Sequence, residues 1–340
     1  MKRFFCILSI ILISCQSDSQ KPRITVWYGE EQHFGKLGYP QPWINILGNV
    51  NSDQGIAQSV YQINGGKDHF FSMGADGRRL ARQGDFNLDI HVDSLQQGEN
   101  QLTILVTDSL GNQSSTNISL FLHPRQNWAL PYRIHWDSVA NIQDVALIVD
   151  GKWKLTTEGI RTEEPYYDRV IAIGGNSWQN YEVSTSVIFH DFTPPREGPP
   201  TFGVSHAAIA SRWPGHDLDE HQPHVKWYPL GATSEFRLST QLDSCRWRIF
   251  DGENLYAEDS SSLRSIQLDT KYRMIHQVIS INDSTTRYSV KLWEAKRPEP
   301  SGWDFVAEEV AENNITSGSA LIIAHNTDVT FGDIEVVPVP

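Results

Sequence analysis

The feature that most constrains this fold is a series of short apolar runs separated by turn residues, which extends from residue 24 to the C-terminus. Apolar and polar residues alternate clearly at 86–90, 102–106 and 117–122, and this period of two is typical of β-strands with one buried face. Turn sequences such as Asn64-Gly65-Gly66 supply the positive φ that tight turns need. No amphipathic helical pattern is longer than about two turns, so the sequence predicts an all-β protein.

Composition excludes several classes of protein. The 340 residues are 39% hydrophobic and carry a net charge of −13, which argues against a disordered chain and against nucleic acid as a partner. Two of the three cysteines lie within the first fifteen residues, and Cys245 is the third. If Cys6 is removed with an export signal and Cys15 is lipidated, Cys245 has no partner for an internal disulfide, and large apolar cores must stabilise the fold. At roughly 150 residues per domain, the length predicts two domains.

The first fifteen residues have the pattern of an export signal. A basic pair, Lys2 and Arg3, precedes an apolar run at 4–13, which is too short to span a bilayer and suits a signal peptide. The run ends in Leu12-Ile13-Ser14-Cys15, which resembles the lipobox of bacterial lipoproteins. An ordinary secretory signal with an incidental cysteine is the alternative.

The lipobox resemblance implies cleavage before Cys15 and lipidation of its thiol. The membrane would then be a partner through the lipid anchor. Residues 1–15 would be the signal peptide and residues 16–23 a tether that begins Gln16-Ser17-Asp18, which is similar to the acidic tether of exported lipoproteins of the Bacteroidetes type. We expect a cell-envelope protein that is lipid-anchored in the outer membrane and surface-exposed.

Residues 24–123 are expected to form one β-sandwich. About six or seven candidate strands with frequent turns fit the immunoglobulin-like pattern. The segments Leu95–Asn100 and Val106–Asn112 resemble the corner and terminal hairpin of bacterial immunoglobulin-like and fibronectin-like modules. The resemblance implies a spacer. Two prolines and a change of pattern mark 124–131 as a linker.

Residues 132–340 are expected to form a second, larger sandwich. About fifteen candidate strands need two packed sheets, because a single open sheet of that width is rare. The segments Trp178–Val183, Tyr288–Glu294 and Ala324–Val336 resemble concanavalin A-like jelly rolls of the laminin G-like type. That family includes lectin domains, polysaccharide hydrolases and lyases, and adhesion modules, so the resemblance does not choose among activities.

The densest polar segment is 196–237, which is rich in histidine, arginine, tryptophan, glycine and proline. Aromatic rings beside polar groups suit sugars, which have an apolar face and a ring of hydroxyls. We therefore predict a polysaccharide groove, and the local cations would suit an anionic polysaccharide. The predicted ligand-binding residues are Arg212, Trp213, His224, Lys226, Trp227 and Arg237. The alternative is a solvated charged loop whose tryptophans belong to the core.

The sequence leaves catalysis open. No pair of carboxylates has the strand spacing that a retaining glycosidase needs. Candidates for proton abstraction by a polysaccharide lyase are Tyr167, His206, His224 and Lys226. A binding protein is therefore the favoured interpretation, a polysaccharide lyase or glycoside hydrolase is the alternative, and a non-catalytic adhesion or structural module is the second alternative.

No cofactor is expected, and structural calcium is left as an open alternative. The histidines of 216–224 have no compact zinc-binding spacing, and prolines on both sides oppose a helix. The oxygen ligands available for calcium are Asp217, Asp219 and Asp333.

Overall fold

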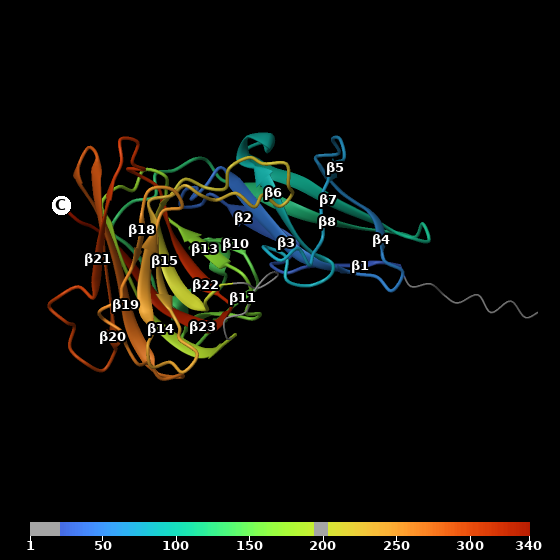
Figure 1. Ribbon diagram of the computed structural model, residues 1–340. Coiled ribbons are helices and arrows are strands. Elements are labelled where there is room, and N and C mark those ends of the chain that lie inside the picture. Colours follow the sequence, from blue (N-terminus) through green and yellow to red (C-terminus); the bar gives the residue numbers. More distant parts are fainter. Residues whose placement is uncertain (1–20, 194–202) are drawn as a thin grey trace, which may run out of the picture.

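The computed structural model describes residues 21–193 and 203–340, and within them the chain is built almost entirely of β-strands (Figure 1). The predicted all-β fold class is therefore confirmed. Cys15 and the rest of 1–20, together with part of the polar segment at 194–202, lie outside the described residues. No helix in the described part of the chain has the length and apolar character needed to cross a membrane.

The first part of the chain forms a small sandwich of two sheets. The three-stranded sheet has the order β1(Arg23–Val26), β3(Trp43–Asn51), β6(Asp85–His91). The five-stranded sheet has the order β2(Glu31–Phe34), β8(Gln113–Leu122), β7(Gly98–Asp108), β4(Ile56–Ile63), β5(His69–Phe70). Alternate residues of β7, such as Leu102 and Ile104, are fully buried and belong to one apolar cluster with Ile46 and Leu88 of the other sheet. Assignment of this sandwich to the immunoglobulin-like family stays a prediction.

The second part forms a large sandwich of the jelly-roll type predicted above. The eight-stranded sheet has the order β11(Trp153–Thr156), β12(Gly159–Thr162), β23(Thr327–Pro338), β14(Tyr181–Phe192), β19(Lys271–Asn282), β20(Thr285–Glu294), β21(Phe305–Val310), and β9(Tyr132–Ile134) also pairs with β23. The seven-stranded sheet has the order β10(Leu147–Asp150), β13(Arg169–Ile173), β22(Ser319–His325), β15(His206–Trp213), β16(Ala232–Arg237), β17(Arg246–Phe250), β18(Tyr256–Glu258). The main core lies between these two sheets.

Part of the seven-stranded sheet is apolar on both faces. Ile171 and Ile322 point into the core between the two large sheets, whereas their neighbours Val170 and Ile323 belong to the apolar cluster of the small sandwich. Figure 1 shows the small sandwich lying against the β10, β13 and β22 side of this sheet. The two sandwiches therefore share a continuous apolar contact, which covers one part of the outer face of the sheet.

A buried arginine joins the two sandwiches. Arg79 is 7% exposed, and its guanidinium lies 2.6 Å from a carboxylate oxygen of Asp89 in β6 and 2.7 Å from one of Asp150 in β10. It also donates to the backbone carbonyls of Val149 and His224. Because buried charges are stable only when they are paired and hydrogen-bonded, Arg79 fixes how the two sandwiches dock.

The Arg79→Ala variant is expected to lose about 3–5 kcal/mol of unfolding free energy, because two buried carboxylates lose their partner. Urea unfolding followed by tryptophan fluorescence measures this loss. The control is Arg82→Ala, since the Arg82 side chain is 69% exposed and pairs with Glu164 at the surface. Exposed pairs contribute about 0–1 kcal/mol. Equal losses in the two variants would contradict the docking role of Arg79.

A second buried polar group lies between the two large sheets. The Nδ1 atom of His276 in β19 is 2.7 Å from the hydroxyl of Ser234 in β16, and its Nε2 atom is buried with no hydrogen-bond partner among the described residues. Burial, followed by the charge of Arg212, lowers the pKa of His276 to about 3. The folded protein therefore keeps His276 neutral at pH values where an unfolded histidine, with a pKa of about 6.5, takes up a proton.

This histidine makes stability depend on pH in a defined direction. Its folded-state pKa is depressed, so its contribution is fully present above about pH 6.5 and is lost as the pH falls toward 3. Between pH 6 and 4.5, the wild type should lose about 1.4 kcal/mol per pH unit more than His276→Gln does. Urea unfolding at several pH values measures the two slopes. His221→Gln, whose side chain is 66% exposed, is the control, and parallel slopes for wild type and His276→Gln would refute this account.

Candidate functional site

The part of the seven-stranded sheet that the small sandwich leaves uncovered holds a pocket of about 300 Å³. Its floor is made by outward-facing residues of β15, β16, β17 and β22, because strand pairing sets Glu235 opposite Arg248 and His206 opposite both Arg237 and His325. The loop from Trp213 to Ala232 supplies one wall. The lining residues are Tyr167, Asp168, Gly203, Val204, His206, Trp227, Tyr228, Thr233, Glu235, Arg237, Arg248, Phe250, Ile323 and His325.

One wall of the pocket is aromatic. The rings of Trp227 and Tyr228 lie 4.6 Å apart, and those of Tyr228 and Phe250 lie 5.4 Å apart. All three residues are half-buried, so their rings keep part of their surface open to solvent. Burial raises the pKa of the Tyr228 hydroxyl well above its usual value, so this tyrosine is neutral. The wall offers a continuous apolar surface to a ligand.

The floor beside this wall holds paired charges, and the guanidinium of Arg248 lies over the ring of Phe250 at 4.3 Å. The carboxylate of Glu235, 3% exposed, accepts two hydrogen bonds from Arg248, at 2.8 and 2.6 Å. Burial raises the pKa of Glu235, while the charge of Arg248 opposes this shift. Arg237 pairs with Glu258 at 3.0 Å. Since each arginine already has a carboxylate partner, the pocket presents polar groups without a large excess of positive charge.

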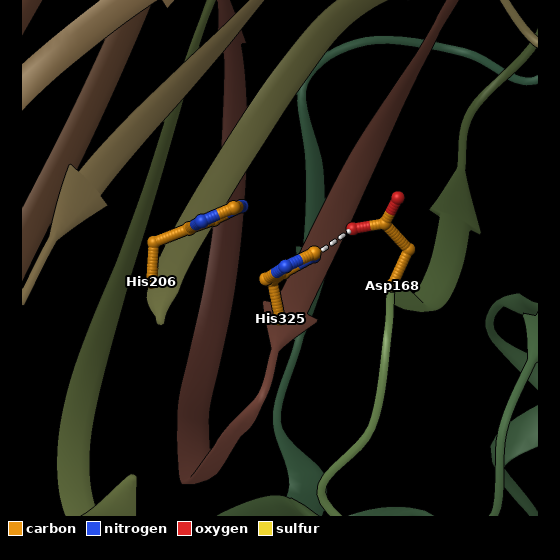
Figure 2. Close-up of side chains that lie close together, drawn as sticks. All are labelled: Asp168, His206 and His325. Carbon is orange, nitrogen blue, oxygen red and sulfur yellow. Dashed lines mark hydrogen bonds and ion pairs between the residues drawn. The ribbon is translucent and has the colours of Figure 1, made fainter. Parts of the chain in front are cut away.

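A cluster of two histidines and one aspartate lies at one end of the pocket (Figure 2). The rings of His206 and His325 stack with a centroid distance of 4.6 Å and an angle of 4° between their planes. The Nδ1 atom of His325 is 2.7 Å from a carboxylate oxygen of Asp168, and the Nδ1 atom of His206 is 2.7 Å from the carbonyl oxygen of Val204. In each ring the Nδ1 atom makes a hydrogen-bond contact with an oxygen atom, and this contact sets the orientation of the ring.

The electrostatics of this cluster follow from burial. Burial, followed by the charge of His325, holds the pKa of His206 well below its usual value. Burial alone would raise the pKa of Asp168, but the charge of His325 and its hydrogen bond to Asp168 outweigh that effect and lower it. Asp168 is thus an ionised carboxylate beside a neutral His206.

The backbone bends sharply on both sides of the cluster. Asp168 has a φ of 30° and Asn326, which follows His325, has a φ of 51°. Residues other than glycine rarely adopt this left-handed conformation, and it is often found at functional sites. Asp168 lies just before β13, and Asn326 forms the turn between β22 and β23, so these bends place Asp168 and His325 at neighbouring strand ends.

The small sandwich reaches this end of the pocket. Arg78 donates a hydrogen bond of 2.8 Å to the hydroxyl of Tyr167, whose ring packs edge-on against His325 at 4.7 Å. Burial, followed by the charge of Asp168, raises the pKa of Tyr167 to about 12. The lining of the pocket therefore comes from the larger sandwich, and the small sandwich supports it through the contact of Arg78 with Tyr167.

The structure brings four of the predicted site residues into this pocket: Tyr167, His206, Trp227 and Arg237. Two others lie nearby but outside it. His224 is buried, and its ring packs against Trp43 of the small sandwich at 4.5 Å. Lys226 is exposed and pairs with Asp217 at 2.9 Å.

Arg212 and Trp213, which the sequence predicts to bind a ligand in a groove, both have fully buried side chains and do not line the pocket. The pairing of β15 with β22 shifts register between Ala210 and Trp213, and Arg212 has a φ of 54°. This irregularity turns Arg212 inward, where it donates to the carbonyls of Gln179 and Ile315. Trp213 packs instead into the apolar cluster shared by the two sandwiches.

The predicted calcium ligands do not gather in one place. Asp217 pairs with Lys226, and Asp219 accepts hydrogen bonds from the backbone of the loop that follows it. Asp333 lies beside the ring of His135 and accepts from the backbone of Trp136. Calcium binding by these residues stays a prediction.

Several lining residues were not predicted from the sequence: Asp168, Glu235, Arg248, Phe250 and His325. His325 is 119 positions from its strand partner His206, as the residue numbers show, and only the pairing of β15 with β22 brings them together. Period-two alternation does place Glu235, Arg237 and Thr233 on one face of β16. That alternation is the one signal in the sequence that could have identified Glu235.

Comparisons with known proteins identify no family. No family model and no curated protein matches this chain. One similar solved structure is the calcium-bound exoplasmic/lumenal domain of VIP36, with 11% identity and a TM-score of 0.36 over 56% of this chain and 82% of that one. A galectin-like protein of unknown function from Bacillus subtilis has 12% identity and a TM-score of 0.35 over 61% of this chain and 94% of that one.

A third similar structure covers more of the chain. It is SGBP-B of the mixed-linkage glucan utilization locus of Bacteroides ovatus, in complex with a mixed-linkage heptasaccharide. The identity is 11% and the TM-score 0.21 over 93% of this chain and 100% of that one. Because all three TM-scores are low, the function of this chain has to be argued from its own pocket.

Proposed function

We propose that this protein binds a polysaccharide in the pocket on the seven-stranded sheet of its larger sandwich. The observation that supports this proposal is the aromatic wall of Trp227, Tyr228 and Phe250 beside a floor of arginine, glutamate and histidine side chains. A pyranose ring has an apolar face that packs on aromatic rings and hydroxyl groups that need polar partners.

Arg237 is the polar group best suited to hold a sugar hydroxyl or carboxylate. Its Nη1 atom pairs with Glu258, whereas its Nε atom is buried, lies 3.8 Å from a carboxylate oxygen of Glu235 and makes no hydrogen bond among the described residues. A buried donor without a hydrogen bond costs free energy, and a bound oxygen atom would supply that bond. Because Glu235 and Glu258 balance the charges of Arg248 and Arg237, the substrate class proposed here includes neutral as well as anionic polysaccharides.

Affinity electrophoresis of the chain from Lys21 onward, in gels that contain neutral β-glucans, xylan, alginate, pectate or sulfated galactans, tests this proposal. At least one polysaccharide should retard the wild type. Trp227→Ala should weaken binding by about 10–100-fold, because loss of a stacked ring costs roughly 1–3 kcal/mol. Assays of new reducing ends and of unsaturated uronate absorbance on the same samples distinguish binding from cleavage.

The matched control is Trp293→Ala, which removes another half-buried tryptophan from β20 of the other large sheet. This variant should be retarded like the wild type. The absence of retardation in every gel, or equal retardation of Trp227→Ala and the wild type, would overturn the pocket as a glycan site. Turnover lost in Tyr167→Phe would favour the alternative of a lyase or glycoside hydrolase.

We further propose that the chain is a lipoprotein anchored through Cys15 at the cell surface. The support is the Leu12-Ile13-Ser14-Cys15 sequence after a short apolar run. Expression of the full chain in a bacterium with labelled palmitate should give a labelled, membrane-associated product. Cys15→Ser should be unlabelled and leave the membrane fraction, whereas Cys245→Ser should behave like the wild type; labelled Cys15→Ser protein would refute this anchor.

A further inference from the structure

Among the described residues, one group of three histidine or acidic side chains has the geometry of a metal site. One donor atom from each of Asp168, His206 and His325 can be chosen so that all three lie within 4.8 Å of one another. We propose that these three side chains bind a divalent transition-metal ion at the end of the pocket. This inference rests on their geometry and is independent of the proposed glycan binding.

The donors lie within reach of one ion after small movements of the side chains. Imidazole nitrogen and carboxylate oxygen lie about 2.0–2.2 Å from Zn²⁺, so two ligand atoms of a tetrahedral site are about 3.3 Å apart. The Nδ1 atom of His325 and the oxygen of Asp168 are already 2.7 Å apart. A metal ion would replace the shared proton between these two atoms, and His206 would supply the third ligand.

The surroundings of His206 suit it as a ligand. Its Nδ1 atom faces the carbonyl oxygen of Val204 at 2.7 Å, which a neutral ring can satisfy only by donating its Nδ1 proton. The Nε2 atom then carries the lone pair, and a histidine that ligates through one nitrogen commonly donates from the other to a carbonyl. Glu235, which is paired with Arg248, lies 3.6 Å from this Nε2 atom.

The ligand types indicate which ions to test. Two imidazoles and one carboxylate suit zinc and its neighbours in the first transition series, whereas calcium prefers sites made only of oxygen atoms. Three protein ligands leave a fourth position for water or for a ligand in the pocket. A metal ion lies close to the plane of each imidazole that binds it, so the parallel rings of His206 and His325 must turn out of their stack when the ion binds.

The test titrates Zn²⁺ and Co²⁺ into the metal-stripped chain from Lys21 onward, without polysaccharide. Calorimetry should show one Zn²⁺ per chain, and Co²⁺ should give the visible absorption of a tetrahedral site. Asp168→Asn, His206→Ala and His325→Ala should each weaken binding about 100-fold or more. Urea unfolding of each variant without metal establishes that it is folded, and Asp168→Asn preserves the shape of the side chain.

The matched control is His221→Ala. His221 is exposed and lies 3.3 Å from Asp219 in the loop that follows β15, so it offers a histidine–aspartate pair outside the pocket. Binding that persists in His221→Ala and is lost in the three site variants supports the proposal. Absence of stoichiometric binding, or binding that is lost only in His221→Ala, overturns it. Neither result depends on whether a polysaccharide binds.

Discussion

The interaction on which the rest of this structure depends is the apolar contact between the small sandwich and the outer face of the seven-stranded sheet. Strands β10, β13 and β22 are buried on both faces, and water is excluded from the second face only because the small sandwich covers it. Arg79, Asp89 and Asp150 add a buried polar connection. The pocket lies on the remainder of this outer face, where residues of β15, β16, β17 and β22 line it.

The sequence predicted the class of fold well because alternation of apolar and polar residues is a local property. The sequence could not show that the seven-stranded sheet is buried on both faces. The apolar residues of β22 do not reveal which part of the chain covers them. The sequence likewise could not show which tryptophans are buried and which face a ligand. Those fully or almost fully buried are Trp128, Trp136, Trp153, Trp178, Trp213 and Trp247. Most tryptophans therefore build cores, and only Trp227 contributes its ring to the pocket.

The sequence could point to single residues that line this pocket, but not to their arrangement. The segment 196–237 supplies His206, Trp227 and Arg237 to the pocket, but a register shift in β15 turns Arg212 inward. His325 and Asp168 join the site through strand pairing over long separations in sequence. No periodicity encodes such pairings, so the histidine pair could be found only in three dimensions.

The shared contact also determines how the protein would bear a mechanical load. If the chain binds a polymer in the pocket and is anchored ahead of residue 21, as proposed above, the polymer would pull on the larger sandwich and the anchor would hold the chain at β1. The force would then pass from β1 to β3 through their antiparallel hydrogen bonds and across the apolar contact to β10. The segment at 124–131, which the sequence predicts to be a linker, would therefore be bypassed, and the apolar contact would carry the load between the two sandwiches.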